Sequence, residues 1–144
     1  MNELSEQDLR RIYEETKTIA VVGVSGDPSK AAHEIPRYLQ GQGYRILPVT
    51  PKGGELFGER VYTSLDEIDV PIDAVDVFRP PDEGPAIAEG AAKLGAKVLW
   101  FQEGTHSDEG ERIAREAGLT VVSGRCMGMT HGMLGLGPGP WKGI

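Results

Sequence analysis

The sequence has little of what disulfides, membrane spans and nucleic-acid surfaces require. Cys126 is the single cysteine among 144 residues, so no internal disulfide is expected. Lys and Arg number 15 against 22 acidic residues, and this net charge of −7 disfavours a nucleic-acid or anionic-membrane surface. No apolar run reaches the length of a membrane span. The first residues, MNELSEQDLRR, lack the apolar core of a signal peptide, so we expect a cytoplasmic protein.

Short β-rich segments alternate with helix-like segments along the chain. The first β segment, at 18–24, is continuously apolar, as in a parallel strand that is buried on both faces. Further strands are expected at 44–49, 73–78, 97–101 and 119–122, and helices at 5–17, 64–68, 81–94, before Gly41 and after Ser107. We therefore predict one Rossmann-like α/β domain over residues 1–144. Its sheet should be doubly wound and mainly parallel, with five to six strands and helices on both faces.

Proline and glycine mark two further features of this pattern. Pro36 falls within the helix that ends before Gly41, and because proline disrupts helix interiors we expect it in or near the first turn. Residues 123–144 contain seven glycines and two prolines without a helical period. We expect these residues to form an irregular tail that covers the edge of the sheet.

A glycine-containing turn follows the first predicted strand and leads into a helix. Its residues are Gly23, Val24, Ser25 and Gly26. Backbone N–H groups at the start of a helix can hold a diphosphate without a charged side chain. Ser25 would add a hydroxyl and Lys30 a positive charge. The alternative is a turn whose glycines serve only tight packing between strand and helix.

The second predicted strand ends in Thr50-Pro51-Lys52, where an NAD site would have an acid. A lysine suits a phosphorylated ribose, either the 2′-phosphate of NADP or the 3′-phosphate of coenzyme A. The sequence lacks G-x-G-x-x-G, which counts against an NADP-binding oxidoreductase. The alternative for Lys52 is an ordinary solvated loop lysine.

The third predicted strand leaves the sheet through Phe78-Arg79-Pro80-Pro81. Two prolines beside an aromatic ring would form an apolar lip for an adenine face or a pantetheine arm. The alternative is a rigid strand exit in which Pro81 begins the next helix, and both interpretations can hold together.

In this order, the segments GVSGDPSK, GYRILPVTPK, DAVDVFRPP, WFQEG and GRCMG resemble the CoA-binding domain family. The resemblance is to its stand-alone bacterial branch, which is related to the N-terminal domain of the succinyl-CoA synthetase α subunit. It covers most of the chain, from about Thr18 to His131. The resemblance implies that CoA or an acyl-CoA binds, with phosphates at the turn after the first strand. The site residues that it implies are Ser25, Gly26, Asp27, Pro28, Lys52, Phe78, Arg79 and Pro80.

The resemblance gives no support for ligase chemistry, because the synthetase's phosphorylated histidine lies in a later domain. Cys126 and His131 are five residues apart and would make a nucleophile if they paired. We favour a small buried cysteine, and one Cys with one His is too few for a structural zinc site. We therefore predict a binding domain without catalytic or metal-binding residues. The alternative function is that of a regulatory interaction domain, in which CoA occupancy switches a protein partner. The sequence does not identify that partner.

Overall fold

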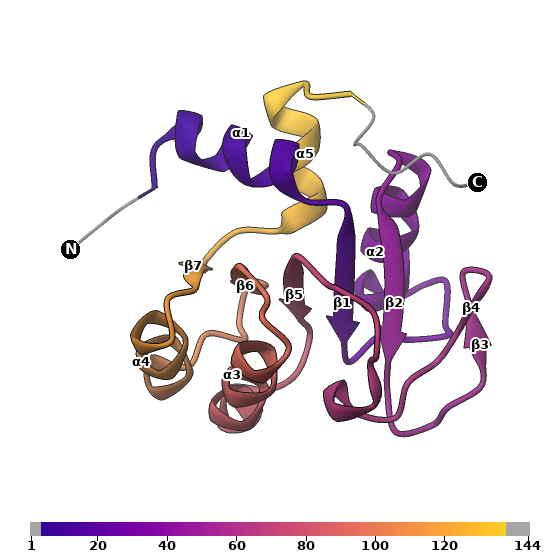
Figure 1. Ribbon diagram of the computed structural model, residues 1–144. Helices are drawn as coiled ribbons and strands as arrows, with labels where there is room; N and C mark the ends of the chain where they lie inside the picture. The colour runs from indigo at the N-terminus through magenta and orange to yellow at the C-terminus, as the bar shows by residue number, and fades with distance from the viewer. Residues whose placement is uncertain (1–3, 138–144) are drawn as a thin grey trace.

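The computed structural model describes residues 4–137, and its centre is a parallel sheet of five strands (Figure 1). The order across the sheet is β2-β1-β5-β6-β7, and every neighbouring pair is parallel. The strands are β1 (Thr18–Val22), β2 (Arg45–Val49), β5 (Ala74–Val77), β6 (Val98–Phe101) and β7 (Thr120–Val122). The predicted doubly wound sheet is confirmed. None of the described helices is long and apolar enough to cross a membrane.

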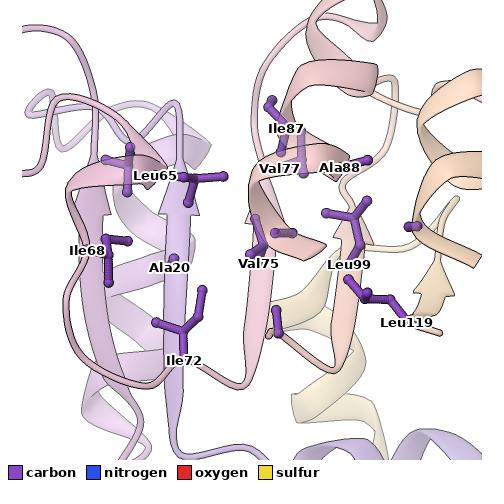
Figure 2. Close-up of a cluster of buried hydrophobic side chains, with 14 of the residues drawn as sticks. Ala20, Leu65, Ile68, Ile72, Val75, Val77, Ile87, Ala88, Leu99 and Leu119 are labelled. Atoms are coloured by element: carbon purple, nitrogen blue, oxygen red, sulfur yellow. The ribbon is translucent and has the colours of Figure 1, made fainter. Parts of the chain in front are cut away.

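Helices cover both faces of the sheet, as predicted (Figure 1). They are α1 (Glu6–Glu15), α2 (Ala31–Gly41), α3 (Gly84–Lys93), α4 (Asp108–Glu116) and α5 (Met127–Leu134), with the 3-10 helices η1 (Leu65–Glu67) and η2 (Pro81–Glu83). Alternate strand residues point to opposite faces. Ala20, Val75 and Leu99 pack beneath η1, α3 and α4 (Figure 2), whereas Ile19 and Val21 pack beneath α1, α2 and α5.

The first helix begins where the sequence predicts and ends earlier. Ser5 Oγ accepts a hydrogen bond from Asp8 N at 3.0 Å, and Asp8 Oδ2 accepts one from Ser5 N at 2.9 Å. This reciprocal capping box fixes the helix start. The helix ends at Glu15 because Asp73 Oδ2 accepts hydrogen bonds from the backbone N–H groups of Lys17 and Thr18, at 2.9 and 3.1 Å. Those bonds draw the chain into β1.

The prediction of an irregular tail over 123–144 is wrong for Met127–Leu134, which form α5. Packing explains the helix better than propensity does. Tyr13 Oη donates to the carbonyl of Met127 at 2.6 Å. A Cβ on Gly128 would lie 3.1 Å from Ile35 Cγ2, so glycine lets α5 approach α2 closely. Residues 138–144 of the predicted tail lie outside the described part of the chain.

Pro36 lies at the start of the second turn of α2, near the first turn but not in it. Its missing N–H leaves the carbonyl of Ala32 without the usual helical donor. The N–H of Ser25 donates to that carbonyl at 3.1 Å. The carbonyl of Ala32 is therefore satisfied despite the proline, and this hydrogen bond links α2 to the glycine turn.

A two-stranded hairpin, β3 (Glu55–Leu56) and β4 (Glu59–Arg60), interrupts the segment after β2. Its tip is Phe57-Gly58, with φ of 57° and 76°, as in the tight turns that match strand twist. Gln40 Nε2 donates to the carbonyl of Phe57 at 2.7 Å, and the Phe57 ring lies 4.9 Å from the His33 ring. These contacts hold the hairpin against α2.

Candidate functional site

A cleft of about 640 Å³ opens at the carboxyl ends of β1 and β2. This volume is in the range of small-molecule sites. Strand β1 has its sequence successor β2 on one side and β5 on the other, so the cleft lies where the strand order reverses. Open α/β sheets bind ligands at such switch points. Five of the predicted site residues line the cleft, namely Gly23, Thr50, Pro51, Lys52 and Arg79.

Sequence reasoning missed the opposite wall of this cleft. That wall consists of Thr63, Ser64, Leu65 and Asp66 around η1, and Glu83, Ala86, Ile87 and Gly90 on η2 and α3. Gly90 is the sequence signal that was available. A Cβ at this position would lie 3.0 Å from Leu65 Cδ1, so a glycine inside α3 allows η1 to rest on the helix. Leu65 and Ile87 appear together in this layer in Figure 2.

Hydrogen bonds across the sheet edge fix the backbone that follows β2. The N–H of Thr50 donates to the carbonyl of Tyr62 at 2.9 Å, and the N–H of Gly53 donates to the carbonyl of Thr50 at 3.1 Å. Lys52 therefore sits on a closed turn with its side chain exposed. It has no ion-pair partner among the described residues. Its ammonium group is available to a ligand in the cleft.

Gly23 is required by local packing, whichever ligand binds. Its φ is 91°, a conformation that L side chains rarely adopt. A Cβ would lie 2.7 Å from Arg79 Cδ and 3.0 Å from the carbonyl oxygen of Phe78. The stem of Arg79 thus lies directly over the glycine, which places this arginine beside the end of β1.

The turn after Gly23 is largely closed by its own hydrogen bonds, contrary to the expectation of several free N–H groups. Ser25 N donates to Ala32, as described above, and Asp27 N donates to Ser25 Oγ at 3.0 Å. Asp27 Oδ1 accepts from Ser29 N at 3.0 Å, and this bond lowers the pKa of the Asp27 carboxyl. Within the described chain, the exposed N–H of Gly26 has no acceptor.

Several predicted site residues lie outside the walls of the cleft. Phe78 is partly buried and packs against the core on the face that α1, α2 and α5 cover. Pro80 is exposed and caps η2, which Pro81 begins, as the rigid-exit interpretation predicts. Ser25, Gly26, Asp27, Pro28 and Lys30 belong to the adjoining turn, where Lys30 is the exposed N-cap of α2.

Two cations and two anions face the cleft, so its formal charge is zero. The cations are Lys52 and Arg79, and the anions are Asp66 and Glu83. Glu83 holds Arg79 through two parallel hydrogen bonds, from Nε to Oε1 at 3.0 Å and from Nη2 to Oε2 at 2.6 Å. This contact lowers the pKa of the Glu83 carboxyl.

Cys126 and His131 do not form a nucleophilic pair. His131 is buried, with Nε2 3.0 Å from the carbonyl of Gly137 and Nδ1 3.0 Å from Tyr38 Oη. A carbonyl can only accept, so Nε2 carries the proton and Nδ1 accepts from the tyrosine hydroxyl. Both nitrogens are therefore occupied, and burial lowers the pKa of the imidazole. The prediction of a buried cysteine is wrong, because Cys126 is partly exposed and is the N-cap of α5.

Comparison with known proteins identifies close relatives of similar length. An uncharacterized protein of Bacillus subtilis, YneT, is 37% identical over 131 residues, which are 91% of this chain and 97% of YneT. A solved structure of the protein cell-free ID.343 from Thermus thermophilus is 43% identical, with a TM-score of 0.87 over 91% of this chain and 99% of the other. The fold thus recurs in small proteins of the same extent.

A longer relative carries an enzyme name. The alpha subunit of acetate–CoA ligase [ADP-forming] I of Pyrococcus furiosus is 28% identical over 131 residues. The match takes in 80% of this chain and 28% of that subunit. The family model described as "CoA binding domain" matches residues 17–132, a segment that contains the glycine turn, the whole lining of the cleft and most of α5. This chain therefore belongs to the CoA-binding domain family.

Proposed function

We propose that the protein binds coenzyme A or a short acyl-CoA in the cleft at the end of β1 and β2. The observation that carries the proposal is Lys52, an exposed lysine without an ion-pair partner in the described chain, at the position where this type of fold places a ribose. A phosphorylated ribose occurs in CoA and in NADP. Membership of the CoA-binding domain family favours CoA.

The neighbouring residues suit the remaining parts of such a ligand. Arg79 is a second cation in the same cleft, and guanidinium groups bind phosphate through two parallel hydrogen bonds. The free N–H of Gly26 and the side chain of Lys30 are the donors that we assign to the diphosphate. Because His131 uses both ring nitrogens and Cys126 has no imidazole partner, we propose binding without catalysis by this chain.

Free CoA should raise the melting temperature more than NADP or NAD does. A ligand at a hundredfold excess over its dissociation constant stabilises the folded state by about 2.7 kcal/mol. Differential scanning fluorimetry with the three ligands at equal concentrations measures the order. A larger shift with NADP than with CoA would reverse our choice of ligand.

Replacing Lys52 should separate CoA from dephospho-CoA, which lacks the 3′-phosphate. A charge-assisted contact to phosphate contributes about 1.5–3 kcal/mol, so Lys52→Ala should weaken CoA binding about ten- to hundredfold. It should barely affect dephospho-CoA. Lys30→Ala, if Lys30 contacts the diphosphate, should weaken both ligands alike. Titration calorimetry gives all four affinities.

The exposed Lys93, in the last turn of α3 and outside the cleft, provides the matched control. Lys93→Ala removes the same charge and should change neither affinity by more than about twofold, because exposed charges at a distance are screened. Equal weakening of CoA and dephospho-CoA by Lys52→Ala would contradict the assignment of Lys52 to the 3′-phosphate.

A further inference from the structure

The Arg79–Glu83 pair occupies the place where the cleft would bind an anion. Glu83 Oε1 and Oε2 accept from Nε and Nη2 of Arg79, and this fork-to-fork geometry is the one that arginine offers to a phosphate group. Both side chains line the cleft together with Lys52. In the ligand-free cleft, the carboxylate of Glu83 thus takes the donors that a phosphate would use.

The stem of the Arg79 side chain lies against Gly23, where a Cβ would lie 2.7 Å from Arg79 Cδ, so the guanidinium is presented beside the end of β1. The Arg79 side chain is 45% exposed, so a ligand can reach it. No other donor among the described residues holds Glu83, whose side chain is 43% exposed. Exposed ion pairs contribute little to stability, so this pair can exchange partners readily.

We propose that Glu83 is a built-in competitor for phosphate, which keeps Arg79 paired in the empty cleft and gives it up when a phosphorylated ligand binds. The inference rests on the proposed function, because it assigns a role to the same cleft. Glu83 would set the affinity and the selectivity of the site. A ligand with a doubly charged phosphate would displace the carboxylate, whereas a singly charged anion would compete poorly.

The test replaces Glu83 by glutamine and measures the affinity for CoA by calorimetry. Glu83→Gln keeps the size of the side chain and removes its charge, so CoA should bind up to about fivefold tighter, the upper limit for releasing an exposed ion pair. Glu89→Gln is the matched control, because Glu89 is an exposed residue of α3, the helix that follows Glu83, and does not line the cleft. It removes the same charge and should leave the affinity within about twofold of the original protein.

A double-mutant cycle with Arg79 distinguishes competition from a general charge effect. In the Arg79→Ala background, Glu83→Gln should tighten CoA binding by no more than about twofold, because the donors for which Glu83 competes are gone. A gain of the same size with and without Arg79 would overturn the proposal. Weaker CoA binding by Glu83→Gln would also overturn it, since Glu83 would then contact the ligand directly.

Inorganic pyrophosphate as a second probe separates this inference from the proposed function. If CoA binds to the original protein and equally to Glu83→Gln, the competitor role is overturned while CoA binding stands. If CoA binds to neither, the proposed function fails, and pyrophosphate decides the remaining question. Tighter pyrophosphate binding by Glu83→Gln, abolished by Arg79→Ala, supports the competitor role, and no gain with either probe overturns it.

Discussion

The free energy of unfolding should fall as the pH rises from 5 to 8, and Asp76 should contribute about 3 kcal/mol of that fall. Asp76 lies in β5 and is fully buried. Its Oδ1 accepts from Gln102 Nε2 at 2.6 Å, and its Oδ2 has no partner among the described residues. Burial without a compensating charge raises the pKa of this carboxyl to about 7.

The direction of the pH effect follows from the raised pKa. An unfolded aspartate has a pKa near 3.9, so between about pH 4 and pH 7 the folded state binds a proton that the unfolded state has released. The contribution of Asp76 to the free energy of unfolding is largest below the lower pKa and falls to zero as the pH rises to the higher one. The two pH units from 5 to about 7, at 1.36 kcal/mol per unit, give the stated value. Above pH 7 the loss is complete.

Asp76→Asn should remove this slope, because an amide at the same place does not titrate. Urea denaturation at several pH values measures the difference between the two proteins, which should grow toward high pH. His131, whose pKa burial lowers, has a slope of opposite sign in both proteins, so it cancels in that difference. Asp69→Asn, at an exposed residue, is the matched control and should leave the slope unchanged. Equal slopes for Asp76→Asn and the original protein would contradict the assignment.

Local sequence patterns were sufficient to predict the sheet. Segments such as 19–22 and 98–101 are continuously apolar because a parallel strand between two helical layers is buried on both faces. The helix starts near Ser5 and after Ser107 could be predicted because capping depends on neighbours three residues away, and both serines accept the expected backbone bond.

The sequence could not predict α5 or the second wall of the cleft, because both depend on distant contacts. Met127–Leu134 contains glycines, which by propensity disfavour a helix, and the contacts that stabilise it come from Ile35, which packs against Gly128, and Tyr13, which donates to the carbonyl of Met127. The cleft wall around η1 exists because Leu65 rests on Gly90, which is 25 residues further along the chain. Strand periodicity also fails to show how Asp76 is bonded, since its one side-chain partner among the described residues is Gln102, which follows β6.

Gly84→Ala should lower the free energy of unfolding by about 3 kcal/mol, since it forces apart two helices that meet at glycines. A Cβ on Gly84 would lie 2.7 Å from Ser107 Oγ and would overlap Ser107 Cβ. Ser107 is buried and cannot move freely, because its Oγ caps α4 by accepting from Gly110 N at 2.9 Å. The new methyl group therefore strains the packing and weakens the cap, and lost caps alone cost about 1 kcal/mol.

The same contact is tight from the other helix, so α3 and α4 are close-packed at this point. A Cβ on Gly110 would lie 2.9 Å from the carbonyl carbon and oxygen of Gly84, which are backbone atoms.

Gly41, the last residue of α2, is the matched control, with open space around its Cβ position and no positive φ. Gly41→Ala should be neutral or stabilise by up to about 1 kcal/mol through helix propensity. Guanidinium denaturation measures both variants, and a cost below about 1 kcal/mol for Gly84→Ala would mean that α3 and α4 separate without penalty. Because α3 carries Ile87 and Gly90 of the cleft wall, Gly84→Ala should also weaken CoA binding, whereas Gly41→Ala should not.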